Sequence, residues 1–367
     1  MKIISLAGRI KHFYVGDDMI SSVLQKDIEY VISDNTISWQ KLKGATVLIT
    51  GATGLIGGAL CHVLRCADKK YSLGLFIICL GRNYVKLKFL EEEGISDLLL
   101  NCDIIHEFSN DGIPDKIDYI FHCAAVTKSS EMISNPVGVI SSSINGTENI
   151  LRYSAKCSCK GFLYLSSMEV YGQTDLLEVN EKDLGYIDLL NIRSCYPESK
   201  RLCETLCISY MKQYGVPVKI ARLAQTFGAG TPKDDTRVFA QFARSAINQN
   251  DILLRTDGSS RGNYCYLSET ILGLLYIMLN GINGEVYNVA NPSASCTILE
   301  MAEMVANDIS GNIRVVIEDN NLLKSSIYAP KTGHRLIADK LKSLGWDPKI
   351  GIKEMYERLI EDWRETV

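Results

Sequence analysis

Several features that mark other classes of protein are missing from this 367-residue chain. Basic residues are not in excess: 39 lysines and arginines stand against 43 acidic residues, for a net charge of −4. Nucleic-acid binders usually show a basic excess, so no nucleic-acid partner is expected. No segment is long and apolar enough to span a bilayer, and the short apolar run at residues 1–7 ends at Arg9. The sequence therefore predicts a cytoplasmic protein without a membrane partner.

The twelve cysteines form no C-x-x-C pair, which is the spacing typical of zinc sites and redox motifs. Cys157 and Cys159 are too close together for a zinc knuckle, and no group of acidic and histidine residues suggests a metal. Most of the thiols lie in apolar surroundings, as Cys79 does in residues 76–79. We predict small buried side chains in a reducing compartment and no metal site.

Short apolar runs alternate with helical patterns along most of the chain. Strands are expected at residues 46–50, 75–80, 119–122, 162–165, 218–223 and 286–289, and helices at 22–32, from the 51–58 turn through 66, 137–155 and 199–214. This alternation is typical of an α/β fold with a doubly wound parallel sheet. We expect a helical extension at 1–43, a main domain at 44–228 and a smaller α/β lobe at 229–367. Some segments of that lobe return to the main domain.

A glycine-rich turn joins the first of these strands to the helix that follows. Gly51, Gly54 and Gly57 give a G-x-x-G-x-x-G spacing. The first glycine permits a tight turn, the second lets the backbone approach a pyrophosphate, and the third lets the helix pack closely on the strand. With Thr53 and residues 55–56, this turn presents a helix N-terminus to phosphates. It predicts a dinucleotide site that includes Leu55 and Ile56.

The end of the second strand bears on which dinucleotide binds. A carboxylate there would accept a hydrogen bond from the 2′-hydroxyl of NAD. This chain instead has Arg82, which favours NADP through a 2′-phosphate, although NAD stays open. Asp103 and Ile104 follow another short strand and are candidates for contacts with adenine.

A tyrosine, in the turn before the predicted helix at 199–214, precedes by four residues a lysine inside that helix. Tyr196 and Lys200 would lie on one face of a helix, one turn apart. A free phenol has a pKa near ~10, and a neighbouring ammonium together with a cationic nicotinamide favours the phenolate. We therefore expect Tyr196 to remove a hydroxyl proton while hydride leaves the same carbon, and Lys200 to tune it.

Polar residues follow the strand at 162–165, at the sheet edge where ligands bind. Ser167 is expected to donate to the substrate oxygen, and Ser166 to cap the following turn. Glu169 is a candidate acid–base group.

These motifs together resemble the extended short-chain dehydrogenases/reductases, the NAD(P)-dependent epimerases and dehydratases of nucleotide sugars. The resemblance rests on the glycine turn, His122-Cys123-Ala124-Ala125, Asn145-Gly146-Thr147, the Ser-Ser-x-Glu-Val-Tyr-Gly run from Ser166, the Tyr-x-x-x-Lys pair and Leu344-Gly345-Trp346-Asp347-Pro348. It covers about residues 43–359. It implies a Rossmann domain at 44–228, a substrate-binding lobe at 229–367, and a homodimer formed through two helices per subunit.

Within this family the chain is most similar to UDP-glucuronate decarboxylases, through the run from Arg193 to Arg201. The resemblance implies oxidation of a sugar at C4 followed by decarboxylation or dehydration. It adds Ala124 and Ala125 to the cofactor site. For the substrate site it implies Thr127, Ser167, Met168, Gln225, Arg237 and Arg261.

Departures from the family pattern limit the choice of reaction. Met168 stands where dTDP-glucose 4,6-dehydratases carry an aspartate, and Arg261 lies one residue before the expected arginine position. Simple 4-epimerases do not need Glu169, so epimerisation is the alternative reaction. A dinucleotide-binding subunit without catalysis is the alternative of another class.

Overall fold

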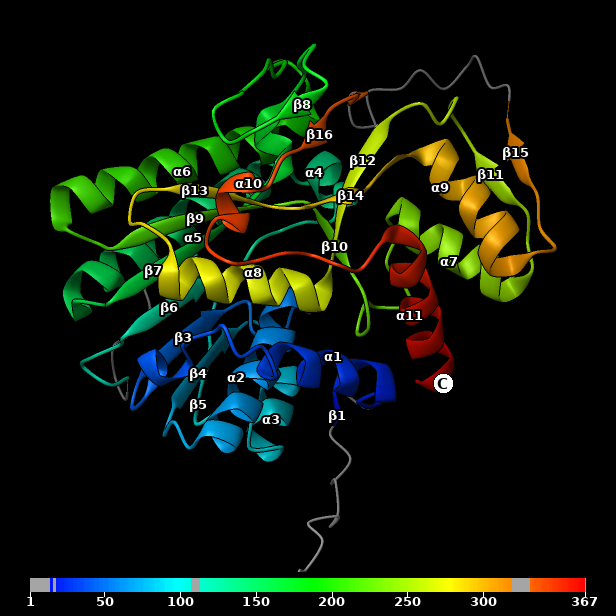
Figure 1. The fold of residues 1–367 in the computed structure, drawn as a ribbon. Coiled ribbons are helices and arrows are strands. Elements are labelled where there is room, and N and C mark those ends of the chain that lie inside the picture. Colours follow the sequence, from blue (N-terminus) through cyan, green and yellow to red (C-terminus); the bar gives the residue numbers. More distant parts are fainter. Residues whose placement is uncertain (1–13, 16–17, 107–112, 319–330, 367) are drawn as a thin grey trace, which may run out of the picture.

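The computed structural model describes residues 14–15, 18–106, 113–318 and 331–366. At its centre lies a parallel sheet of seven strands in the order β13-β9-β7-β6-β3-β4-β5 (Figure 1). In that order the strands are Val286–Val289, Val218–Leu223, Gly161–Ser167, Tyr119–His122, Thr46–Thr50, Phe76–Gly81 and Leu98–Asn101. The chain runs from β3 outward to β5 and returns to β6 on the other side of β3. Ligands bind beyond the carboxyl ends of the strands at such a reversal.

Helices cover both faces of this sheet. α2 (Leu55–Tyr71), α3 (Tyr84–Glu92) and α8 (Leu267–Asn280) pack on one face and share a core with Val47 and Ile49. α5 (Pro136–Cys157) and α6 (Cys195–Tyr214) pack on the other, against Leu48 and Ile120. Because both faces are buried, the strands are continuous apolar runs instead of alternating ones.

The smaller lobe has a core of its own. Phe227 stacks on Phe239 with ring centroids 4.3 Å apart, and Tyr356 meets Phe227 edge-on at 5.4 Å. One small sheet has the order β10-β12-β14, and another pairs β11 with β15. The lobe's elements are β10 (Gln225–Phe227), α7 (Val238–Asn248), β11 (Ile252–Leu254), β12 (Arg261–Tyr266), β14 (Asn291–Thr297), α9 (Ile298–Met304), the π-helix η4 (Val305–Ser310), β15 (Val315–Ile317) and α11 (Ile352–Glu365).

Short elements complete the described chain. They are β1 (Tyr14–Val15) paired with β2 (Asp18–Met19), β8 (Glu178–Val179) paired with β16 (Arg335–Leu336), α4 (Ser129–Ser134), α10 (Asp339–Lys342), and the 3-10 turns η1 (Trp39–Leu42), η2 (Met168–Tyr171) and η3 (Ile192–Ser194). No helix among the described residues is long and apolar enough to cross a membrane.

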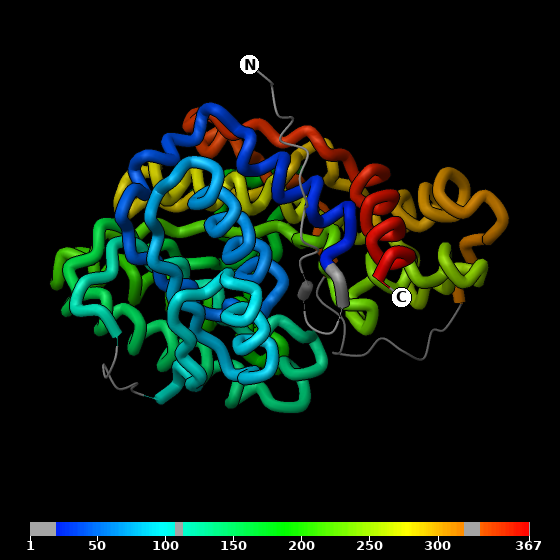
Figure 2. Tube along the Cα trace, turned by 90° about the horizontal axis from the view of Figure 1, so that it is seen from below, coloured from blue at the N-terminus to red at the C-terminus, as the bar shows by residue number. Residues whose placement is uncertain are grey.

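The N-terminal helix α1 (Ser22–Ile32) joins the two halves of the molecule. Its Asp27 is buried, accepting from the Tyr266 hydroxyl at 2.6 Å and pairing with Arg358 of α11 at 2.7 Å. At its start, the backbone N–H of Ser22 donates to Glu365 at 2.6 Å. Figure 2 shows α1 in blue beside α11 in red. Residues 1–13 of the expected extension, with the apolar run at 1–7, lie outside the described residues.

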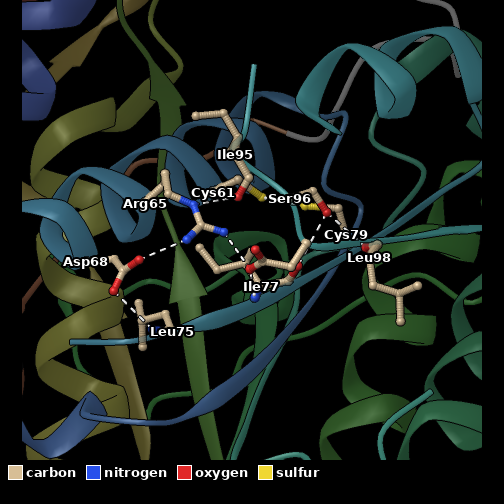
Figure 3. Close-up of polar contacts among 10 residues, drawn as sticks. Cys61, Arg65, Asp68, Leu75, Ile77, Cys79, Ile95, Ser96 and Leu98 are labelled. Carbon is tan, nitrogen blue, oxygen red and sulfur yellow. Dashed lines mark hydrogen bonds and ion pairs between the residues drawn. The ribbon is translucent and has the colours of Figure 1, made fainter. Parts of the chain in front are cut away.

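Arg65 of α2 ties that helix to the outer strands of the sheet. Its guanidinium pairs with Asp68 at 2.8 Å and with Asp97 at 2.5 Å, and donates to the Ile95 carbonyl at 3.2 Å. Figure 3 shows this group beside the buried thiols of Cys61 and Cys79. Because Arg65 is itself buried, its partners offset the cost of burying its charge.

The α/β fold with a parallel sheet covered on both faces is confirmed. The strands expected at 46–50, 119–122, 218–223 and 286–289 and the helix at 22–32 form with those bounds. Other helices extend beyond the expected residues: α2 runs on to Tyr71, and α6 begins at Cys195. Tyr196 therefore lies inside the first turn of α6.

A buried carboxyl group stands at the start of α8. Glu269 accepts from the backbone N–H groups of Lys349 and Ile350, and its other oxygen has no hydrogen-bond partner within the part of the chain that the structure describes. Burial raises the pKa of Glu269 to about 7. The protonated form is therefore favoured in the folded protein.

Glu269→Gln tests this carboxyl through the pH dependence of stability. Because its pKa is raised on folding, the group stabilises the protein fully below pH 4.5, and that contribution is lost as the pH rises through about 7. The lost stability amounts to about 3 kcal/mol. We expect urea unfolding to show a smaller fall in stability between pH 4.5 and 7.5 for Glu269→Gln than for the wild type. Parallel pH curves would contradict the assignment.

Candidate active site

The glycine turn packs against the ends of two neighbouring strands. Gly51 has a φ of +67°, and a Cβ there would lie 2.9 Å from the backbone N and Cα of Ala124. A Cβ on Gly57 would lie 2.2 Å from the carbonyl oxygen of Gly51. The Ala124 N–H donates to Thr50 Oγ1 at 3.1 Å. Two segments that the sequence assigns to the cofactor site, 51–57 and 124–125, are thus brought together at the carboxyl ends of β3 and β6.

The N-terminus of α2 opens at this edge. Gly54 is the N-cap and is exposed, while Thr53, Leu55 and Ile56 are partly exposed. A glycine cap leaves the first N–H groups of the helix to other acceptors. Together with the helix dipole, they suit the diphosphate of a dinucleotide. The residues present therefore fit the group that the motif implies.

The ends of β4 and β5 bring two further predicted residues together. Arg82 lies 3.6 Å from Asp103, and the Arg82 side chain is 68% exposed. Asn101 donates to the carbonyls of Gly81 and Arg82 at 3.3 and 3.1 Å, which fixes the backbone below them. Ile104 is buried against Gly146 of α5, where a Cβ would come within 2.6 Å of it. The Asp103 carboxylate thus partly neutralises the charge of Arg82.

Tyr196 and Lys200 lie on one face of α6, both nearly fully buried. Lys200 Nζ is 5.9 Å from the centroid of the Tyr196 ring and 4.8 Å from that of Tyr164. It donates to the Leu165 carbonyl of β7 at 2.7 Å. That bond holds the first turns of α6 at the end of β7, where Ser167 stands.

The pKa of Tyr196 departs from the sequence expectation. Burial raises it first and the Glu169 carboxylate raises it next, while a hydrogen bond with Ser167 and the charges of Arg193 and Arg237 lower it. Burial also lowers the pKa of Lys200. The net direction at Tyr196 is upward, whereas sequence reasoning expected the ammonium to lower it. That reasoning considered the charges of Lys200 and of a bound nicotinamide ring, and it left out the cost of burying the phenolate.

The two serines that end β7 differ from expectation, because the cap of the following turn is Ser167 and not Ser166. Ser167 is the cap of η2, accepting from the Glu169 N–H at 3.2 Å, and its hydroxyl lowers the pKa of Tyr196. Ser166, expected to be the cap, is buried and donates to Glu204 of α6 at 2.5 Å. Glu204 in turn pairs with the buried Arg222 of β9 at 2.7 Å. This network ties β7, β9 and α6 together beneath Ser167.

Glu169 is held by an arginine to which the sequence assigned no role. Its carboxylate makes a bidentate ion pair with Arg193, with N–O distances of 2.7 and 3.1 Å. Arg193 belongs to η3, directly before α6, and is buried. The position of Arg193, three residues before Tyr196, was the only sequence feature that pointed to a role in the site. Its pairing with Glu169, 24 residues away, could not be predicted from the sequence.

The residues assigned to the substrate lie in different places. Arg237 lies close enough to influence Tyr196, and it is paired with Asp235 at 2.6 Å. Thr127 and Ala125 are exposed after β6, Met168 is partly buried in η2, and Gln225 begins β10. Arg261 begins β12, where it donates to the Ser295 carbonyl at 3.0 Å and lies 3.6 Å from Glu300. The charge of Arg237 thus acts on a catalytic candidate, whereas the contacts of Arg261 are with Ser295 and Glu300.

A G-x-S-x-G spacing also occurs in the chain, at Gly258–Gly262. In hydrolases this motif places a nucleophilic serine on a turn from a strand to a helix. Here the run leads into strand β12, and Ser260 Oγ lies 3.4 Å from Thr332 Oγ1. This setting does not support a hydrolase site.

The part of the chain that matches known proteins includes the glycine turn and the catalytic candidates. Positions 47–290 match the NAD dependent epimerase/dehydratase family. The chain belongs to this family. UDP-glucuronic acid decarboxylase 5 of Arabidopsis thaliana is 30% identical over 324 residues, 87% of this chain and 89% of that protein. UDP-glucuronic acid decarboxylase 1 of the same plant is 29% identical over 89% of this chain and 71% of its own length.

Solved structures of family members share the fold. An epimerase from Methanothermobacter thermautotrophicus has a TM-score of 0.76 at 23% identity, covering 90% of this chain and 96% of its own. UDP-glucuronic acid 4-epimerase from Bacillus cereus, bound to UDP-glucuronic acid and NAD, has a TM-score of 0.72 at 20% identity, covering 87% and 99%. The predicted membership in the nucleotide-sugar epimerases and dehydratases is confirmed.

Gly57→Ala tests whether the close approach of α2 to the glycine turn shapes the dinucleotide site of this epimerase/dehydratase family member. The added methyl group would overlap the Gly51 carbonyl, and overpacking costs about 1–3 kcal/mol. We expect lower thermal stability and about tenfold or more weaker NAD binding by calorimetry. Gly58→Ala is the matched control, because its Cβ meets Ala52 at an ordinary 3.4 Å. Equal NAD affinity in both variants would show that the close approach does not shape the site.

Proposed function

We propose that this chain decarboxylates a nucleotide-linked uronic acid through transient oxidation of the sugar at C4. The observation that carries the proposal is the meeting of Ser167, Glu169, Tyr196 and Lys200 at the end of β7, one strand from the β6 end that contacts the glycine turn. The likeness to UDP-glucuronic acid decarboxylases over most of the chain supports this choice of reaction.

The proposed roles follow from these contacts. When bound, a nicotinamide dinucleotide supplies the hydride acceptor and returns the hydride later. Tyr196 takes the proton of the C4 hydroxyl, and Ser167, whose hydroxyl lowers the pKa of the phenol, orients the same oxygen. Lys200 holds the base at the strand end and adds positive charge beneath it. The positive charge of an oxidised nicotinamide ring would counter the upward shift that burial imposes on Tyr196.

A ketone at C4 explains the second step. With a carboxylate at C6, the 4-ketone makes a β-keto acid, which loses carbon dioxide readily. The Glu169 carboxylate, held by Arg193, is close enough for its charge to raise the pKa of Tyr196. We place it against the sugar ring during decarboxylation.

We infer that NAD is preferred over NADP. Arg82 alone favours a 2′-phosphate, but its partner Asp103 offsets that charge and offers an acceptor to a ribose hydroxyl. Separate titrations with the two dinucleotides test this choice, and tighter binding of NADP would overturn it.

A panel of UDP-, dTDP-, GDP- and CDP-sugars, with and without a C6 carboxylate, tests the reaction. We expect loss of carbon dioxide from a uronic acid, read by mass spectrometry. Tyr196→Phe should lower turnover by about 10²–10⁴-fold while NAD binding is kept. Loss of water would indicate a dehydratase. Unchanged mass with altered NMR couplings would indicate an epimerase, and full turnover by Tyr196→Phe would remove the proposed base.

We also propose that the chain forms a homodimer through α5 and α6. These helices lie side by side on one face of the sheet (Figure 1). Each keeps large apolar side chains exposed, including Val137 and Ile140 on α5 and Leu202 on α6. Such exposure favours burial against a second copy. Light scattering should give a dimer for the wild type and a monomer for Leu202→Glu, and a monomeric wild type would refute the proposal.

A further inference from the structure

Glu169 and Arg193 form a well-defined ion pair in the site. Arg193 Nη1 donates to Glu169 Oε2 at 2.7 Å and Nη2 donates to Oε1 at 3.1 Å, a bidentate geometry that makes Arg–carboxylate pairs strong and directional. Arg193 is buried, and the Glu169 side chain is 28% exposed, so the pair sits at the border between core and crevice. Water screens such a pair less than one at the surface.

The segments that carry the pair are each fastened by further bonds. The Asn191 side chain accepts from the Arg193 N–H at 2.9 Å and begins η3. Arg201 of α6 donates to the Val170 carbonyl at 2.9 Å and to the Gly185 carbonyl at 2.7 Å. Glu169 is thus set from both sides: Arg193 holds the carboxylate, and Arg201 holds the backbone that follows it.

Charged and polar groups from several elements act on the Tyr196 phenol. Glu169 of η2 raises its pKa, whereas Arg193 of η3, Arg237 before α7 and the Ser167 hydroxyl of β7 lower it. Lys200 of α6 lies near the rings of Tyr164, from β7, and Tyr196, and Cys195 directly precedes Tyr196. Arg193 is the one among these that both binds Glu169 and opposes its effect on the phenol.

We propose that Arg193 is a positioning residue of the reaction: its guanidinium, three residues before Tyr196, locks the Glu169 carboxylate in place and balances that carboxylate's charge. The inference rests on the proposed function, in which Tyr196 is the base. It explains how a carboxylate can stand next to a phenol that must lose a proton. Without Arg193, the carboxylate would rotate freely and its charge would oppose the phenolate.

Four variants separate this role from a structural one. Arg193→Met removes the charge and the lock, Glu169→Gln removes the opposing charge, and the double variant removes both. Arg193→Lys keeps the charge without the two-pronged geometry. Arg314→Met is the matched control, because Arg314 pairs with Asp251 at 2.7 Å on the exposed surface of the smaller lobe. Thermal unfolding of each variant reports any general loss of folding.

The first measurement needs no sugar. A polyfluorinated tyrosine, whose phenol is more acidic than that of tyrosine, replaces Tyr196 in the full chain with NAD bound, and its ¹⁹F shift is followed against pH. We expect the ionisation midpoint to rise by about one pH unit with Arg193→Met and to fall with Glu169→Gln. In the double variant it should lie between the values of the two single variants, because both the opposing charge and its counter-charge are removed. Arg314→Met should leave it unchanged.

The second measurement is the pH profile of turnover with the sugar found in the panel. Arg193→Met should move the profile to higher pH and lower kcat more than it raises KM, and Arg193→Lys should restore the profile but only part of kcat. Coincident ¹⁹F midpoints in wild type, Arg193→Met and the double variant would overturn the proposal. So would turnover that falls only in step with thermal stability. If the wild type converts no nucleotide sugar, the proposed function fails, while the ¹⁹F order still decides the role of Arg193.

Discussion

The site depends on how closely α2 approaches the end of β3. The Gly51 carbonyl occupies the space that a side chain at position 57 would need, and the Ala124 backbone occupies the space beside Gly51. These contacts set the distance between α2 and the ends of β3 and β6. The helix N-terminus therefore opens over the crevice where the strand order reverses. The catalytic candidates stand one strand further along, at the end of β7, so the parallel register of β6 and β7 sets their distance from the turn.

Much of this arrangement could be predicted from the sequence, because each part of it is local. Strands buried on both faces are continuous apolar runs, which is why residues 46–50 and 218–223 were found with their bounds. The glycine spacing and the four-residue interval from Tyr196 to Lys200 each lie within one turn or helix. Helix ends were less readable: α6 begins at Cys195, where an apolar pattern gives no start signal.

Contacts between distant segments were beyond sequence reasoning. The order of Ser166 and Ser167 fits a cap at either residue, and only the position of Glu204 on α6 decides that Ser166 points into the core. The partner of Glu169 comes from a turn on the far side of a long loop. The upward pKa shift of Tyr196 depends on how deeply the first turn of α6 is buried, which a spacing rule does not contain. Chemistry-bearing residues were thus found individually, while their charge balance required the tertiary structure.

The contacts between α1 and α11 have a consequence for how the chain folds. Ser21 bonds to Asp362, a partner 341 residues away, and Asp27 pairs with Arg358 across nearly the same interval. Loop-closure entropy grows only slowly with loop length, so the span of these contacts adds little to the entropy cost of making them. Contacts so far apart in sequence raise the contact order of the chain, and chains of higher contact order fold more slowly. The join between α1 and α11 therefore slows folding while it fastens the two ends of the described chain together.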